Sequence, residues 1–258
     1  MNHSRNSPPS TIRIETNGSL GLVILDRPEK RNAISEEMIV AIGEAFVTIP
    51  SEWKAVVIRA EGDNFSAGLD LSEHKERSPE AVLDISALWH RVTQSIADCG
   101  VPVICALKGY VVGAGLELAS AAHVRIADPN SRFSLPEGRR GIFVGGGASV
   151  RVGRLIGTSR LMELMLSGRE MDAREALAAG LCQRLSAPEG ACDEAIELGR
   201  EIAGNAPLSN RMILQALAHI AEMPPGGGLF TESLAAALTQ TSPEAVRRIN
   251  AFFDGRRR

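Results

Sequence analysis

The stretch GYVVGAGLELAS, from Gly109 to Ser120, places a carboxylate in an apolar part of the chain. Glu117 lies in a run from Val101 to Ala122 whose only other charged side chain is Lys108. Burial of a carboxylate is costly unless the group has a partner or holds its proton. We therefore expect Glu117 to reach water, to pair with a cation or to take part in proton transfer.

The same stretch joins a predicted strand to a predicted helix. The strand is VPVICAL (101–107), the helix covers about 114–122, and a further strand, HVRIAD (123–128), follows. Strands and helices also alternate upstream, and this alternation predicts crossover connections and a largely parallel sheet. The upstream elements are a hairpin of TIRIET and GLVILD around Asn17-Gly18, a helix over 35–49 capped by Ser35, the strand KAVVIRA (54–60) and a helix over 79–98.

The remainder of the chain is predicted to be helical from about Val144 onward, with an alanine- and leucine-rich stretch after Cys192. Such helices need another surface to pack against, either the body of the same chain or a neighbouring subunit. At the other end, MNHSRNSPPS is polar and contains prolines, which predicts a loose N-terminal arm. The basic GRRR end (255–258) is predicted to be a solvated tail.

Charge and cysteine usage exclude some function classes. The formal net charge of the 258 residues is -3, which gives no electrostatic case for nucleic-acid binding. The four cysteines form no CxxC pair and no signal peptide is recognisable, so we expect a reduced, cytoplasmic protein. The apolar run 101–122 is long enough to span a membrane, but its charges and its glycine and proline interruptions favour a buried strand, loop and helix.

Two glycine-containing turns are candidates for binding an anion. NFSAGLDL (64–71) follows the strand KAVVIRA, and GYVVGAGLEL (109–118) follows VPVICAL. Glycine lets the backbone approach a ligand closely, and a helix N-terminus leaves amides unpaired. Side by side, two such turns would stabilise a carbonyl oxygen that becomes negative, an effect worth about 3 to 4 kcal/mol per donor. Taken singly, each turn is better explained as a tight connection between a strand and a helix.

A second acid follows these turns. Glu137 lies in FSLPEG (133–138), 20 residues after Glu117, on what we expect to be a loop at the end of a strand. Two acids beside glycine-rich turns could hold one water molecule and exchange protons with a substrate. Alone, Glu137 could equally be a solvated loop acid.

Four separated motifs resemble the crotonase superfamily, the enoyl-CoA hydratase/isomerase family, in order and spacing. The resemblance covers the chain from about Thr11 to Arg247 and rests on RPEKRNAIS (27–35), NFSAGLDL (64–71), KGYVVGAGLELA (108–119) and FSLPEGRRGIFVGGG (133–147). It implies an α/β fold with a spiral of repeated ββα units and a helical C-terminal region that mediates homotrimers, often paired into hexamers. On this basis we divide the chain into an arm (1–10), a spiral core (11–190) and a helical C-terminal region (191–258).

The resemblance also assigns residues to the site. The oxyanion-hole amides would be those of Leu69 and Ala114, and Ala114 stands where the family usually has glycine. That amide is retained unless the backbone requires a positive φ, where alanine is disfavoured. Contacts with the coenzyme A (CoA) ester are implied for Lys30 at the nucleotide end and Ala33 at the pantetheine, and for Ala67, Asp70 and Leu71, while Gly145 would line the space near the acids.

Glu117 and Glu137 match the two catalytic glutamates of the hydratases. The resemblance implies that water addition uses both acids, whereas many members that isomerise double bonds or cleave thioesters keep one. The implied activity is syn addition of water to a trans-2-enoyl-CoA to give a 3-hydroxyacyl-CoA, as in fatty-acid β-oxidation. The only partner implied beyond the homo-oligomer is the acyl-CoA thioester. We expect no metal and no separate cofactor, because CoA is part of the substrate, and no binding to nucleic acid or membrane.

Other interpretations stay open on the sequence. The segment around Gly113 and Gly115 imitates a dinucleotide-binding turn, but Leu118 replaces its third glycine and Asp128 follows too soon. Ser66 lies in FSAG, which is not a nucleophile-elbow motif. Within the family, an isomerase, an acyl-CoA hydrolase or an inactive CoA-ester-binding subunit are the alternatives. The adjacent Arg139 and Arg140 would lower the pKa of Glu137 if they face it, and Trp53 and Trp89 are predicted to be core residues.

Overall fold

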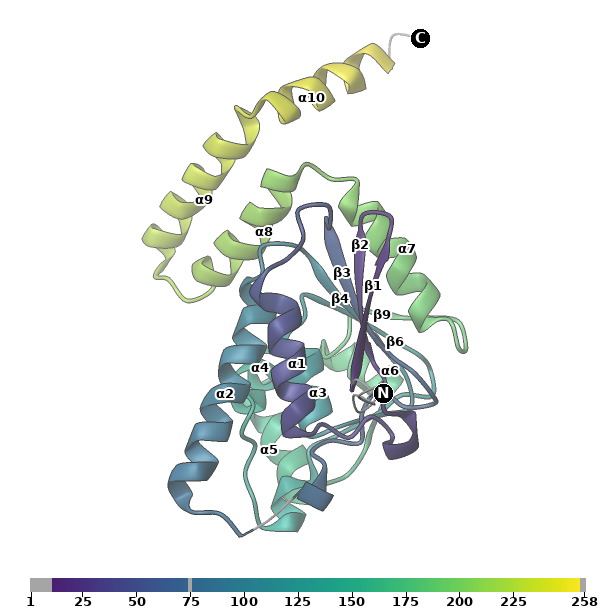
Figure 1. The fold of residues 1–258 in the computed structure, drawn as a ribbon. Coiled ribbons are helices and arrows are strands. Elements are labelled where there is room, and N and C mark those ends of the chain that lie inside the picture. Colours follow the sequence, from purple (N-terminus) through teal and green to yellow (C-terminus); the bar gives the residue numbers. More distant parts are fainter. Residues whose placement is uncertain (1–10, 74–75, 256–258) are drawn as a thin grey trace, which may run out of the picture.

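A six-stranded sheet lies at the centre of the computed structural model, which describes residues 11–73 and 76–255 (Figure 1). The predicted arm (1–10), residues 74–75 and the last three residues of the basic tail lie outside the described residues. The strand order is β1-β2-β3-β4-β6-β9, and only the β1–β2 pair is antiparallel. The strands are β1 (Ile12–Asn17), β2 (Leu20–Leu25), β3 (Ala55–Ala60), β4 (Val103–Leu107), β6 (Val124–Ala127) and β9 (Arg184–Leu185).

The hairpin and the parallel core confirm the predictions from sequence. The β1–β2 turn contains Gly18 at φ 62°, a left-handed conformation that suits glycine. Every residue of β2 is buried, as expected for a strand covered on both faces. The chain then reaches β3 through η1 (Pro28–Lys30) and α1 (Glu36–Val47), whose N-cap Ser35 accepts a hydrogen bond from the Met38 amide.

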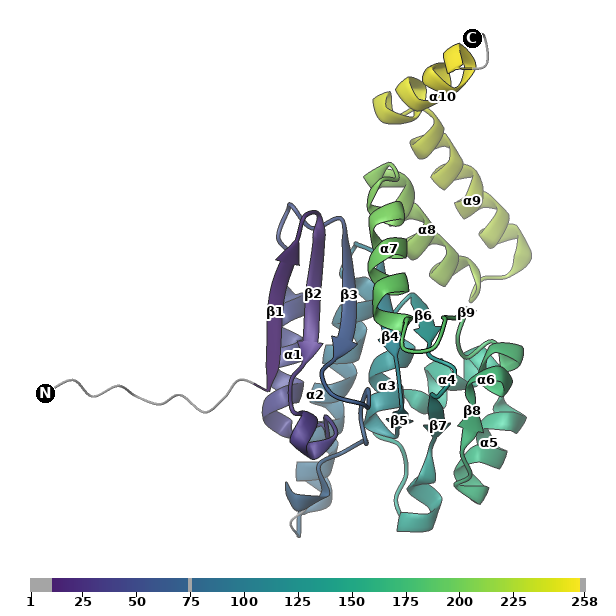
Figure 2. The same cartoon turned by 90° about the vertical axis from the view of Figure 1, so that its right-hand side faces the viewer.

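Helices cover both faces of the sheet. On one face, α1 and α2 (Pro79–Asp98) contribute Ile42, Phe46 and Val92 to the larger apolar cluster. On the other face, α7 (Ala191–Ala203) packs against β2, β3, β4 and β6 and forms a second cluster through residues such as Ala195 and Leu198. The first helix after residue 190 is therefore packed on the sheet, as Figure 2 also shows.

A second, three-stranded sheet was not predicted. It consists of β5 (Tyr110–Val112), β7 (Arg132–Ser134) and β8 (Met171–Asp172), so the stretch that we expected to be a glycine loop contains a short strand. Three residues are too few to show a strand periodicity, and β5 forms because it pairs with the distant β7. The order β1-β2-α1, then β4-β5-α3, with α3 spanning Ala114–Ala121, follows the expected ββα spiral.

The chain after β7 is mostly helical, as predicted. Its helices include α4 (Ala148–Ile156), α5 (Thr158–Ser167), α6 (Ala173–Ala179), α8 (Pro207–Ile220), α9 (Pro225–Gln240) and α10 (Pro243–Gly255). In both ribbon views, α9 and α10 extend away from the sheet, and α9 packs on α8 (Figures 1 and 2). In the described part of the chain, no helix is both long and apolar enough to cross a membrane.

Candidate active site

The first glycine turn lies between two other segments of the chain. On one side the amide of Ser66 donates to the Tyr110 carbonyl at 2.9 Å, and on the other the Asp70 amide donates to the Ile34 carbonyl at 2.9 Å. The Gly68 carbonyl accepts from the Ile34 amide at 2.7 Å. Because Gly68 and Asp70 bond to Ile34, the intervening Leu69 directs its own N–H away from that segment.

The second turn lies beside the first. Gly113 has φ 49° and ψ -118°, and a Cβ added there would lie 3.9 Å from the Gly68 Cα. The same added Cβ would lie 2.8 Å from Oε1 of Glu137, so glycine is required both for backbone conformation and for space. The next residue, Ala114, begins α3 and is not in the positive-φ region, so alanine is unstrained there.

These two turns present a pair of amides with no partner. Across residues 11–73 and 76–255, neither the Leu69 N–H nor the Ala114 N–H donates to another group of the chain. Gly115 fixes their separation, because a Cβ added to it would lie 2.6 Å from the Ser66 Cβ. The start of α3 therefore packs directly on the first turn, and the two free amides can share one acceptor, as in an oxyanion hole.

Glu117 lies on the first turns of α3 and is 3 % exposed. Its Oε1 accepts from the Gly146 amide at 2.6 Å and from the Ala148 amide at 3.4 Å, and its Oε2 accepts from Trp89 Nε1 at 3.1 Å. Burial raises the pKa of Glu117, and these N–H donors partly oppose that effect by favouring the carboxylate. The question posed by the apolar stretch thus has a structural answer: Glu117 is buried but hydrogen-bonded by neutral donors.

Glu137 lies in η3 (Pro136–Arg140) and is 6 % exposed. Its Oε2 is buried and has no hydrogen-bond partner within the described residues. Burial raises the pKa of Glu137, and the nearby charge of Glu117 raises it further. The two acids are therefore close enough to influence each other, and they differ in how well each carboxylate is stabilised.

The two arginines after Glu137 do not reverse this pKa shift. Arg140 favours the charged form, but its effect is smaller than that of burial. Arg139 packs beside Gly168 at the end of α5, where an added Cβ would lie 2.7 Å from its Cδ. Among the described residues, neither arginine forms an ion pair with an acid of the site, and both arginines are exposed. The pKa of Glu137 thus remains above its usual value.

The residues expected to contact CoA lie around the first turn. Asp70 forms an ion pair with Arg27 at 2.9 Å, and hydrogen bonds from Ser72 and Arg27 hold the pKa of Asp70 below its usual value. Arg27 also donates to the Ala33 carbonyl at 2.8 Å, which ties the η1 loop to this turn. Of the remaining predicted contacts, Lys30 is exposed at the end of η1, Leu71 is exposed in η2 (Leu71–Glu73), and Ala67 and Gly145 are half-buried.

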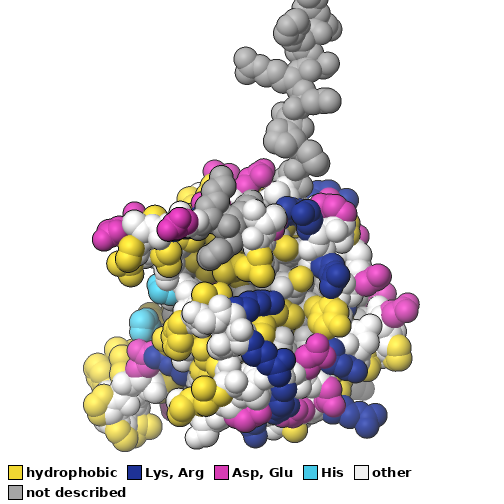
Figure 3. All heavy atoms as spheres, turned by 90° about the horizontal axis from the view of Figure 1, so that it is seen from below, with side chains coloured by type: hydrophobic (Ala, Val, Ile, Leu, Met, Phe, Trp, Pro, Cys, Tyr) yellow, Lys and Arg dark blue, Asp and Glu magenta, His cyan; other side chains and the backbone are white. Residues whose placement is uncertain are grey.

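Hydrophobic and basic side chains share the face around these loops. Figure 3 views that end of the molecule and shows apolar side chains beside a band of Lys and Arg. The exposed apolar residues of η2, of the start of α2 and of the loop after η3 are Leu71, Val82, Leu83, Ile142 and Phe143. A ligand with both an apolar and an anionic part would find complementary groups there.

Sequence reasoning missed several residues of the site. The predicted Gly145 accepts from Ser86 through its carbonyl at 2.6 Å, but the neighbouring Gly146 supplies the amide to Glu117. Trp89 is buried, which confirms the core prediction, yet its indole N–H also binds Glu117. No local pattern links Trp89 to an acid 28 residues away in sequence.

Ser66 holds the loop in place. Its hydroxyl donates to the Asn32 carbonyl at 2.7 Å and accepts from the Gly68 amide at 3.2 Å. Asn32 is fully buried and donates in turn to the Glu61 and Asn64 carbonyls. The hydroxyl of Ser66 is therefore committed to structure, which disfavours a nucleophilic role.

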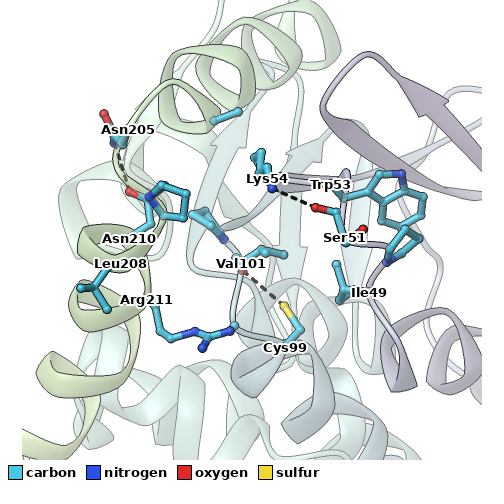
Figure 4. Close-up of a pocket in the computed structure, with 15 residues that line it drawn as sticks. Ile49, Ser51, Trp53, Lys54, Cys99, Val101, Asn205, Leu208, Asn210 and Arg211 are labelled. Carbon is cyan, nitrogen blue, oxygen red and sulfur yellow. Dashed lines mark hydrogen bonds between the residues drawn. The ribbon is translucent and has the colours of Figure 1, made fainter. Parts of the chain in front are cut away.

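A separate cavity lies at the opposite ends of the strands. It has a volume of about 420 Å³ and opens between the starts of β3 and β4 and the first turn of α8 (Figure 4). Lys54 and Arg211 line it, with no Asp or Glu among the lining residues. The Cys99 thiol in its wall donates to the Val101 carbonyl, and burial raises the pKa of that thiol. The cavity therefore offers no acid-base pair and no activated nucleophile.

Comparisons with known proteins agree with this geometry. The enoyl-CoA hydratase/isomerase family model matches residues 15–247. The short-chain-enoyl-CoA hydratase of Clostridium acetobutylicum is 32 % identical, with 81 % of each chain covered. The carnitinyl-CoA dehydratase of Salmonella enteritidis is 34 % identical over 83 % of this chain and 82 % of the relative.

Solved structures show the same fold over almost the whole chain. A Rhodopseudomonas palustris structure, provisionally described as an enoyl-CoA hydratase, is 50 % identical and has a TM-score of 0.94, with 96 % of each chain covered. The enoyl-CoA hydratase of Mycobacterium smegmatis is 26 % identical and has a TM-score of 0.90, with 95 % of this chain and 96 % of that chain covered. The paired turns, the two buried acids and these similarities show that the chain belongs to the enoyl-CoA hydratase/isomerase family.

Proposed function

We propose that this chain is an enoyl-CoA hydratase that adds water in syn fashion to a trans-2-enoyl-CoA. The observation that carries the proposal is the convergence of two buried glutamates, Glu117 and Glu137, beside two amides that have no partner among the described residues. Isomerisation or thioester cleavage could proceed with fewer acids. The relatives described above include a hydratase and a dehydratase, both of which are named for adding or removing water.

The proposed reaction begins with the thioester carbonyl. The amides of Leu69 and Ala114 stabilise its oxygen as negative charge develops, which makes Cβ electrophilic. Glu117, whose carboxylate form the N–H donors favour, orients a water molecule and accepts one of its protons as the oxygen bonds to Cβ. Glu137, with its raised pKa, delivers the proton that ends on Cα. The proton that Glu117 accepted from water later passes to Glu137. Both acids are then back in their starting protonation states.

The ligand contacts follow from the surface around the site. Lys30 of η1 would lie at the nucleotide end of CoA, and the loops near Ala33 and Ala67 would hold the pantetheine. Asp70, fixed by Arg27, and Leu71 would border the same path. Gly145 would line the acyl end through the loop whose carbonyl Ser86 holds. CoA enters as part of the substrate, and proton transfer alone requires neither a metal nor a redox cofactor.

The assembly and the compartment are part of the proposal. We infer a homotrimer, or a hexamer of two trimers, because α9 and α10 extend from the body with exposed apolar side chains. All four cysteines are free thiols, which suits a reducing compartment such as the cytoplasm.

The test is loss of enoyl absorbance when the purified protein is mixed with crotonyl-CoA and a panel of longer and aromatic 2-enoyl-CoAs. We expect hydration in the wild type and a loss of roughly a hundredfold or more in Glu117→Gln and in Glu137→Gln, since each variant removes a proton-transfer group. Hydration that survives in one variant would contradict the two-acid mechanism. CoA thioester binding without hydration would favour the isomerase, the hydrolase or the inactive binding subunit. Assays of 3-enoyl-CoA isomerisation and of free CoA release would then distinguish these three alternatives.

A further inference from the structure

Trp89 forms a buried polar contact with the carboxylate of Glu117. The residue is 3 % exposed on α2, and its Nε1 donates to Glu117 Oε2 at 3.1 Å. The indole packs so closely on the neighbouring loop that a Cβ added to Gly146 would lie 1.9 Å from its Cδ1. Tryptophan Nε1 is a donor only, so a buried indole needs an acceptor, and here that acceptor is a candidate catalytic group.

The two oxygens of Glu117 are held by different parts of the chain. Oε1 receives backbone amides of the 146–148 loop, whereas Trp89 is the one donor to Oε2 among the described residues. The loop is itself tied to α2, because Thr93 Oγ1 donates to the Gly146 carbonyl at 3.2 Å. Helix α2 therefore positions Oε1 through the loop and Oε2 directly.

We propose that Trp89 is a positioning residue that fixes the rotamer of Glu117 and favours the carboxylate form of this acid for water activation. The proposal rests on the proposed hydratase function where it concerns turnover, but the contact itself does not require turnover. A donor to a charged acceptor stabilises the charged form, so the indole N–H favours the base over the acid. The hydrogen bond from Trp89 also restricts rotation of the Glu117 side chain, because the other carboxylate oxygen is held by backbone amides.

Other charges around Glu117 set the background for this effect. The charge of Glu117 raises the pKa of Glu137 in η3, His90 from α2 favours ionisation of Glu117, and Arg151 from α4 lies near enough for Glu117 to affect its pKa. Within the described part of the chain, none of these groups forms a hydrogen bond with the Glu117 carboxylate, whose donors are Trp89, Gly146 and Ala148. Removal of the indole N–H therefore changes the contact at Oε2 and leaves these neighbouring charges in place.

The test compares Trp89→Phe with Trp53→Phe. Trp53 is a matched control because it is 5 % exposed and its Nε1 donates at the same distance, 3.1 Å, to Thr16 Oγ1 on the hairpin. In Trp89→Phe we expect kcat to fall more than KM changes, and the acidic limb of the kcat/KM profile to move upward by about one pH unit, the order expected for one hydrogen bond to a charged group. Trp53→Phe keeps the wild-type profile. Melting temperatures and circular dichroism establish that both variants are folded.

A fluorescence titration tests the contact without turnover. The chain contains two tryptophans, so Trp53→Phe leaves Trp89 as the only indole. We expect its emission to titrate with pH and the titration to disappear in the Trp53→Phe/Glu117→Gln double variant. The proposal is overturned if the emission does not follow Glu117, or if folded Trp89→Phe keeps the wild-type profile. If no enoyl-CoA is hydrated but the titration is present, the hydratase proposal fails while the positioning contact stands.

Discussion

At the scale of single residues, the two buried acids differ in their partners. Glu117 has N–H donors on both carboxylate oxygens, whereas Oε2 of Glu137 has none in the described part of the chain. Burial raises the pKa of both acids. Because donors stabilise only the charged form, we assign the base to Glu117 and the proton donor to Glu137.

The raised pKa of Glu137 predicts an effect on stability. At a pH below 4.5, the ordinary pKa of a glutamic acid, Glu137 holds its proton in both the folded and the unfolded chain. Its ionisation then contributes nothing to the free energy of unfolding. As the pH rises above that value, the unfolded chain ionises first, and the free energy of unfolding falls until the pH passes the raised pKa of the folded state. Glu137→Gln avoids this loss. We expect it to unfold at a higher temperature than the wild type at about pH 8 and at a similar temperature at about pH 4.

Calorimetry or dye-monitored melting at both pH values checks this prediction. Glu170→Gln, which replaces an exposed acid, serves as the control. We expect its melting temperatures at the two pH values to differ by as much as those of the wild type. An equal shift of Glu137→Gln at both pH values would mean that the amide acts through packing and not through ionisation.

The amide of Ala114 gives a second prediction at this scale. Ala114 is the first residue of α3 and has no positive φ, and proline is tolerated at that helix position. Ala114→Pro removes the N–H, so we expect kcat to fall by roughly 10²- to 10³-fold. Ala114→Gly keeps the N–H and, at a cost of at most about 1 kcal/mol in stability, retains kcat. Steady-state hydration kinetics test this prediction. An Ala114→Pro variant with wild-type kcat would show that the Ala114 amide is not part of the oxyanion hole.

At the scale of elements, the site depends on how α3 begins. This helix has eight residues, all of them buried, and it starts at the turn whose backbone only glycine adopts readily. Its isolated stability would be small, since short helices are marginal in water. Packing against the first glycine turn and against α2 and α4 therefore holds it, and the same packing brings the two amides together.

Gly115 tests this dependence. In Gly115→Ala the new Cβ would lie 2.6 Å from the Ser66 Cβ, so α3 must move away from the first turn. A displacement of that kind at the reacting groups can cost about a hundredfold in rate, and we expect kcat to fall on that order. The control is Gly153→Ala in α4, where the nearest atom, Leu161 Cδ2, lies at 3.4 Å. It should leave kinetics unchanged and raise stability by up to about 1 kcal/mol. Normal kinetics for Gly115→Ala would show that the turns tolerate a wider separation.

At the scale of the whole molecule, the last two helices have apolar sides that no other part of the described chain covers. The exposed apolar residues that form these sides of α9 and α10 include Leu229, Phe230, Leu234, Leu238, Val246, Ile249 and Phe253. Such a surface is large for a chain that stays monomeric in water, and it favours burial against further copies of the chain.

We therefore predict that a charge on α9 disrupts the assembly. Phe230 is 66 % exposed, and Phe230→Glu places a carboxylate where the proposed interface would exclude water. Light scattering should give three or six times the chain mass of 27.5 kDa for the wild type and a smaller species for the variant. Val47→Glu, on the exposed side of α1, is the control and keeps the wild-type mass. A wild-type protein that is monomeric at micromolar concentration would contradict the trimer.

The sequence by itself determined the family, the order of the longer strands and the helices, and the pair of candidate acids. These features depend on residues that are close in the chain: an Asn-Gly turn between apolar runs, a capping serine, glycines that end strands. The tertiary structure decided the rest. Strand β5 forms only by pairing with β7. The N–H groups that stabilise the carboxylate of Glu117, and so make it differ from Glu137, come from α2 and from residues 146–148. Local periodicity and propensity cannot specify such contacts, because hydrogen bonds between distant segments form only where packing brings those segments together.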